Sequence, residues 1–151
     1  MSESYNVQEA LKAAIMTEKA AMDFYKFGAT KMIDEHACRT FEILSKDELH
    51  HARMFYDAYQ GSDLPPFDEL IAAPPDTESP WWKALQQILL GGFDEQRALE
   101  LAIDQVIGLY CTYSLSRNWI ASKLYNDKYF SISQLEFGLV LRFKKDKNFL
   151  Y

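Results

Sequence analysis

Two glutamates and one histidine have side chains and a spacing in the sequence that would suit a metal site. Glu18 lies between Leu11 and Tyr25 at helical intervals, so it falls on an apolar stripe rather than on a polar face. Glu48 and His51 are three residues apart, so on a helix they share one face. An unpaired buried carboxylate costs several kcal/mol, and a bound cation would offset that cost.

Helical bundles bind paired iron or manganese ions with such residues. One inward glutamate comes from each of two helices, and a Glu-x-x-His motif comes from each of the other two. Oxygen and nitrogen donors suit iron and manganese, whereas iron–sulfur clusters need thiolates. The pattern therefore predicts a metal site with Glu18, Glu48 and His51. The alternative is a metal-free core, because Glu-x-x-His is a short motif and an inward glutamate can pair with lysine or arginine.

Two long helices must position these residues. The first is expected over 7–33, where alanine is frequent and proline is absent, and the second over 35–60. Asp34 is a suitable N-cap for the second helix, and Gly61 is a stop signal. The apolar stripes comprise Val7, Leu11, Ala14, Ile15, Met22, Tyr25 and Met32 in the first helix, and Phe41, Leu44, Ala52, Phe55 and Tyr59 in the second.

The rest of the chain predicts a long connection followed by further helices. All five prolines lie within 61–80, which indicates a crossover. The fold class is therefore all-α, a four-helix bundle that forms a single domain over 1–151. After the second helix we expect a helical turn at 67–72, a short helix at 81–90 that Ser79 and Pro80 initiate, a long helix at 95–116 that Asp94 caps, and a fourth helix at 123–146.

The sequence also resembles a known family. Residues 10–25, ALKAAIMTEKAAMDFY, are similar to the first helix of rubrerythrin-like proteins of the ferritin-like superfamily. Residues 47–52, DELHHA, are similar to the ligand motif of their second helix. The resemblance is good over 7–60, fair over 94–113 and poor after residue 116.

This resemblance implies a four-helix bundle with a di-iron carboxylate centre, whose relatives reduce peroxide, oxidise ferrous iron or store it. Glu18, Glu48 and His51 would be metal ligands, and Tyr25 would donate a hydrogen bond to a ligand. Iron is the implied metal, with manganese or zinc as substitutes. The resemblance also favours a homodimer, because rubrerythrin-like bundles commonly pair.

An internal repeat adds a fourth candidate ligand. A shift of 88 residues aligns 10–25 with 98–113, and five of 16 positions are identical. The same shift aligns Glu48 with Glu136, which we therefore include among the candidate ligands.

The repeat is degenerate at the other ligand positions. Glu18 aligns with Val106, and His51 aligns with Leu139. The chain is thus expected to hold at most one metal ion, with weak or absent peroxidase or ferroxidase turnover. The alternative function is a non-catalytic helical bundle, a binding or oligomerisation module that has lost the di-iron centre.

The composition changes abruptly near residue 117. Residues 1–116 carry nine basic and 19 acidic side chains, whereas residues 117–151 carry seven basic and three acidic ones. Only one of the 15 alanines lies in the second segment. Two explanations remain open, a diverged fourth helix and a change of reading frame. Translation of the neighbouring frames of the source DNA distinguishes them.

Charge and hydropathy exclude other classes of function. The net charge of −6 disfavours nucleic acid as a partner. No apolar run approaches the roughly 20 residues of a membrane span, and no signal peptide is visible, so we expect cytoplasmic localisation.

Cys38 and Cys111 form no CxxC pair, so a catalytic role would need a separate electron donor. Of the adjacent Trp81 and Trp82, one ring is expected to cap the bundle core and the other to be an interface anchor, and an exposed pair would favour a two-fold dimer.

The repeat gives a first prediction. The double substitution Val106→Glu and Leu139→His should raise the metal content of the purified protein toward two ions per chain, because it restores the ligand types of the first half. Elemental analysis measures the change. A folded double variant that binds no more metal than the parent would contradict the duplication argument.

Overall fold

The computed structural model describes residues 6–90 and 92–104, and it divides the chain into two compact units, 1–98 and 99–151. The described part is helical and contains no strand, which confirms the all-α class. None of its helices is long and apolar enough to cross a membrane. The helices are α1 (Val7–Ala29), α2 (Glu35–Ala58), α3 (Phe67–Ala72) and α4 (Pro80–Leu89), and residues 95–104 are also helical.

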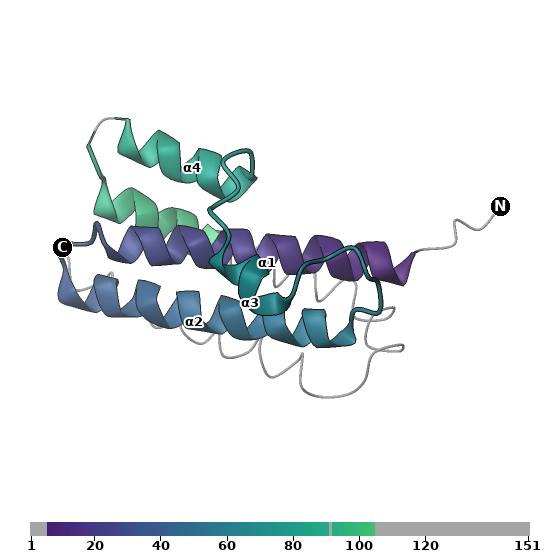
Figure 1. Ribbon diagram of the computed structural model, residues 1–151. Coiled ribbons are helices and arrows are strands. Elements are labelled where there is room, and N and C mark those ends of the chain that lie inside the picture. The colour runs from purple at the N-terminus through teal and green to yellow at the C-terminus, as the bar shows by residue number, and fades with distance from the viewer. Residues whose placement is uncertain (1–5, 91, 105–151) are drawn as a thin grey trace. The chain divides into compact units, whose positions relative to one another are not determined.

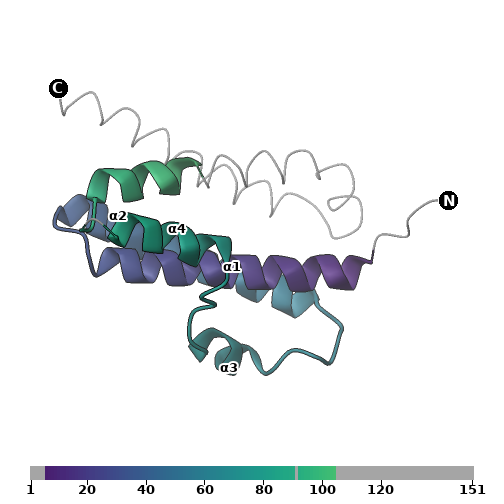
Figure 2. The same ribbon diagram turned by 90° about the horizontal axis from the view of Figure 1, so that it is seen from above.

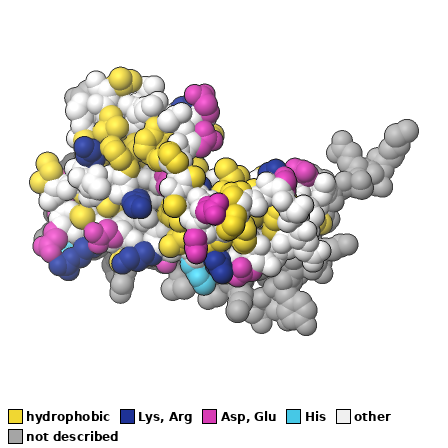
Figure 3. Space-filling view, in the orientation of Figure 1, with side chains coloured by type: hydrophobic (Ala, Val, Ile, Leu, Met, Phe, Trp, Pro, Cys, Tyr) yellow, Lys and Arg dark blue, Asp and Glu magenta, His cyan; other side chains and the backbone are white. Residues whose placement is uncertain are grey.

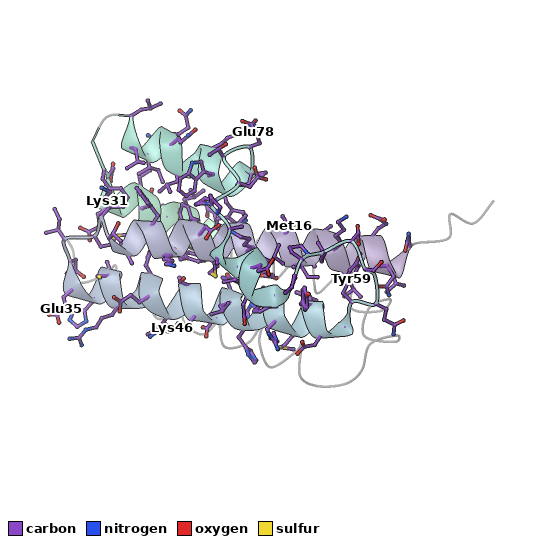
Figure 4. All side chains as sticks on the ribbon, in the orientation of Figure 1. Met16, Lys31, Glu35, Lys46, Tyr59 and Glu78 are labelled. Atoms are coloured by element: carbon purple, nitrogen blue, oxygen red, sulfur yellow. The ribbon has the colours of Figure 1, made fainter. Side chains whose placement is uncertain are left out.

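The antiparallel pair of α1 and α2 is the centre of the first unit (Figure 1). α3 packs on α2 and α4 packs on α1, on different sides of the pair (Figure 2). Charged side chains line the outer edge of α2 (Figure 3), and Glu35 and Lys46 point away from α1 (Figure 4). The pair therefore has a solvated edge and an apolar interior, as amphipathic helices require.

The turn between α1 and α2 starts earlier than predicted. Helix α1 ends at Ala29, four residues before the expected end at residue 33. The amides of Lys31 and Met32 both donate to the carbonyl of Gly28, which closes the last turn. Asp34 has extended backbone (φ −71°, ψ 125°) and accepts from the Ala37 amide at 2.8 Å. The chain must leave the helix before Asp34, because an N-cap residue is not helical.

The ends of the other helices differ from the predicted ends by one or two residues, since α2 ends at Ala58 and α4 spans Pro80–Leu89.

The predicted apolar stripes form the core that α1 and α2 share. Val7, Ala14, Met32 and Tyr59 lie at the margins and are only half-buried. The buried stripe residues are Leu11, Ile15, Met22 and Tyr25 in α1, and Phe41, Leu44, Ala52 and Phe55 in α2.

The connection after α2 is folded against the helical pair. The Tyr56 hydroxyl donates to the carbonyl of Pro65 at 2.8 Å, and its ring meets Phe67 edge-on. The predicted turn at 67–72 is confirmed as α3, which buries Leu70. Ser79 caps α4 by accepting from the Trp82 amide at 3.2 Å.

The structure confirms that one tryptophan ring packs in the core, but the expectation of an exposed pair is wrong. Trp81 is buried against Phe24 and Tyr25, with ring centroids 5.2 and 5.6 Å away. Trp82 is half-buried and meets Phe27 edge-on at 5.6 Å. Both rings pack against aromatic residues of α1, because the first turn of α4 lies on the end of that helix. They therefore give no support to a dimer interface.

Asp94 begins the next helix as predicted, since it accepts from the Arg97 amide at 3.0 Å. The side chain of Glu95 accepts from the amides of Ile33 and Asp34, at 3.1 and 2.9 Å, and so binds the turn between α1 and α2. Residues 105–116 of the predicted third helix and all of 123–146 lie outside the described residues.

A buried lysine fastens the connection to α1. The ammonium of Lys19 donates to Asp23 at 2.6 Å and to the carbonyls of Ala73 and Pro74 at 3.0 and 3.5 Å. Lys19 is 4% exposed and Asp23 is 8% exposed. Three acceptors compensate the ammonium for the water it loses, as a buried charge requires.

This arrangement gives a stability prediction. Lys19→Met should lower the free energy of unfolding by about 3–5 kcal/mol, because it leaves the Asp23 carboxylate buried without its cation. The double variant Lys19→Met/Asp23→Leu should recover much of the loss. Urea unfolding followed by helical circular dichroism measures both, with Lys26→Met on the exposed side of α1 as control. A loss no larger for Lys19→Met than for Lys26→Met would contradict the role of the pair.

Candidate metal centre

The three predicted ligands of the first half lie together between α1 and α2. Glu18 comes from the middle of α1, and Glu48 and His51 come from the second half of α2. One ligand atom from each residue lies within 4.8 Å of the other two. Both glutamates are 1% exposed and the histidine is 8% exposed. Burial of all three confirms that they occupy the apolar stripes.

The Glu-x-x-His spacing has the expected geometric effect. The Nδ1 atom of His51 lies 3.0 Å from Oε2 of Glu48, one helical turn earlier. The same nitrogen lies 3.8 Å from Oε2 of Glu18 on the neighbouring helix. The nitrogen that faces both carboxylates is therefore Nδ1, and the three donors surround a common point.

The donor set fits a divalent cation. Two carboxylates in a buried position carry a charge that the interior disfavours, and a cation between them lowers that cost. Two carboxylate oxygens and an imidazole nitrogen are ligands of iron, manganese and zinc. Within the described residues, this is the group of histidine, cysteine and acidic side chains that could hold a metal ion.

Aromatic rings pack on α1 beyond Glu18. Tyr25 is fully buried, and its ring meets Phe24, Phe41 and Trp81 at centroid distances of 5.2–5.6 Å. These contacts restrict α1 against α2 and α4. The hydrogen bond from Tyr25 to a ligand stays a prediction.

Asp47 is an acidic neighbour that the sequence analysis did not single out. Partial burial raises its pKa, while the adjacent His51 and His50 act in the opposite direction. It lies one residue from Glu48, so it faces a different side of α2 and is half-buried. No pattern in the sequence distinguishes it from the other surface carboxylates of α2.

The structure thus brings together three of the four predicted ligands, and Glu136 lies outside the described residues. His36 and His50 are exposed, as expected for residues off the stripe. Lys19 and Asp23 are the buried charges that sequence reasoning missed. Their i, i+4 spacing was the available signal, but this spacing is also common on solvated helix faces.

Comparisons with known proteins agree with this geometry. Residues 9–71 match the model of the rubrerythrin family. Searches of curated proteins and of solved structures found no match. The matched segment spans nearly all of α1 and the whole of α2, and it includes Glu18, Glu48 and His51. Over residues 9–71 the chain is thus similar to the rubrerythrin family, and its described helices are consistent with an all-α ferritin-like bundle.

Proposed function

We propose that this chain binds one iron or manganese ion through Glu18, Glu48 and His51. The observation that supports the proposal is their convergence, with three buried donor atoms from two helices within 4.8 Å. Two carboxylates balance the charge of one divalent ion. The rubrerythrin family match over these residues favours iron.

The chain's own residues would position the ion. Glu18 fixes it to α1, and Glu48 and His51 fix it to α2, so binding joins the two helices. The i, i+3 hydrogen bond between His51 and Glu48 already orients the imidazole toward the carboxylates. Bound iron would supply redox chemistry toward peroxide or oxygen.

We expect little redox turnover from a single chain. Val106 and Leu139 stand where the internal repeat would place a second glutamate and a second histidine, and neither side chain can bind a metal ion. Any turnover would draw electrons from a separate donor protein. Metal binding is therefore the main function that we propose, and oxidoreductase activity is secondary.

The first test is metal stoichiometry. After loading with Mn²⁺ or Fe²⁺ and gel filtration, elemental analysis should give one ion per wild-type chain and almost none for Glu18→Gln, Glu48→Gln or His51→Ala. Glu42→Gln and His50→Ala are matched controls, because these residues are exposed on the same helix and should leave the metal content unchanged. A wild-type chain that retains no metal would favour the non-catalytic bundle instead.

The second test is ligand-linked stability. Free Mn²⁺ at 100 times its dissociation constant should stabilise the wild-type chain by about 2.7 kcal/mol, because the ion binds only the folded state. His50→Ala should show the same gain, and His51→Ala should show none. Thermal unfolding with and without Mn²⁺ measures the difference. Equal gains for the two histidine variants would contradict the assignment of His51 as a ligand.

A further inference from the structure

The segment that contains α3 is attached to α2 close to the candidate ligands. The guanidinium of Arg53 lies 4.7 Å from the ring centroid of Phe67, the first residue of α3. The ring of Tyr56 meets the same ring edge-on at 5.2 Å, and its hydroxyl donates to the carbonyl of Pro65 at 2.8 Å. Arg53 and Tyr56 follow His51 by two and five residues in the same helix. This attachment therefore lies about one helical turn from a candidate ligand.

The other end of α3 is attached to α1 beside Glu18. Ala73, which directly follows α3, and Pro74 both accept from the ammonium of Lys19, the residue after Glu18. A helix of six residues is about 9 Å long, which is close to the usual separation of two packed helices. α3 therefore bridges α1 and α2 on one side of the pair, at the level of the candidate ligands (Figures 1 and 2).

The two attachments differ in burial. Lys19 is 4% exposed, and its salt bridge within α1 is buried. Arg53 is exposed, and the hydroxyl contact of Tyr56 is exposed as well. Exposed polar contacts contribute little to stability, because water competes for the same groups. The segment is thus held firmly at α1 and weakly at α2, so Phe67 marks the end that can leave.

α3 itself has few interactions that hold it in place. It has six residues, its N-cap Pro66 makes no side-chain hydrogen bond, and Leu70 is its one buried residue. Helices this short are not stable alone, and segments with few buried apolar contacts open at a low cost in free energy. Glu18, Glu48 and His51 are 1–8% exposed, so an ion reaches them only through a local opening. Among the described elements beside the ligands, α3 is the one suited to provide it.

Resting on the proposed metal binding, we propose that residues 65–74 form a hinged strap that controls how fast the metal ion enters and leaves. The strap pivots at Lys19 and opens at the α2 side, where Arg53 and Tyr56 release Phe67. It contributes no ligand, and it closes with and without the ion. Its opening therefore changes the rates of uptake and release by the same factor and leaves the dissociation constant unchanged.

The closing experiment loosens the strap at its α2 end. Tyr56→Phe removes the hydroxyl that holds Pro65 and keeps the ring, so it should accelerate release of Mn²⁺ about two- to fivefold, as one lost exposed hydrogen bond predicts. Stopped-flow transfer from the full-length protein to excess fluorescent chelator measures the rate, and competition with the same chelator should give an unchanged dissociation constant. Phe67→Ala removes the ring that Arg53 and Tyr56 both contact, so it should accelerate release further. Glu69→Gln, at an exposed position of α3, is the control and should match the wild-type chain.

Hydrogen exchange of the metal-free protein measures strap opening independently. The amides of Leu70 and Ala73 donate to the carbonyls of Pro66 and Glu69, both at 3.0 Å. Tyr56→Phe should speed exchange of these two amides by the same factor as metal release, while amides in the middle of α1 and α2 keep their rates.

The outcomes separate this inference from the proposed function. An unchanged release rate for Tyr56→Phe and Phe67→Ala overturns control by the strap and leaves metal binding intact. Faster release with an equal rise in the dissociation constant also overturns it, because the strap would then stabilise only the bound state. Wild-type protein that binds no Mn²⁺ overturns the proposed function and this inference together, whatever the exchange rates are.

Discussion

The burial of two carboxylates and an imidazole between two helices is the constraint on which the rest of the site depends. Charged groups in an apolar seam are tolerated only with compensating charge or hydrogen bonds. Here Glu18, Glu48 and His51 converge closely enough for one cation to serve all three. The apolar residues above and below them hold the helices together, so the ligands need not provide that cohesion. This division of roles explains how an otherwise apolar interface can contain a polar centre.

Most of this candidate site could be predicted from the sequence, because helical periodicity determines which residues turn inward. Glu18 and the Glu48–His51 pair interrupt apolar stripes, and that interruption marked them. The helix N-caps at Asp34 and Ser79 could also be predicted from the sequence, since capping is a local interaction. The end of α1 could not be predicted, because a turn between packed helices depends on tertiary contacts such as those of Glu95.

The contact of Lys19 with the connection after α2 could not be predicted from the sequence for a related reason. Its acceptors in the connection are backbone carbonyls 54 and 55 residues away, and carbonyls have no signature in a sequence. Burial of Trp81 likewise depends on where α4 packs, which local patterns do not specify. The sequence therefore predicted which residues lie inside each helix but not which distant segments would cover them.

The turn between α1 and α2 contains only residues 30–34, and this brevity has a consequence for biosynthesis. All three candidate ligands occur within residues 18–51, so the helical pair that carries them is synthesised before α3 and α4. Short loops close quickly, and hairpins of helices rich in local contacts fold fast. The helical pair that brings Glu18, Glu48 and His51 together can thus form before the segments that follow it have folded.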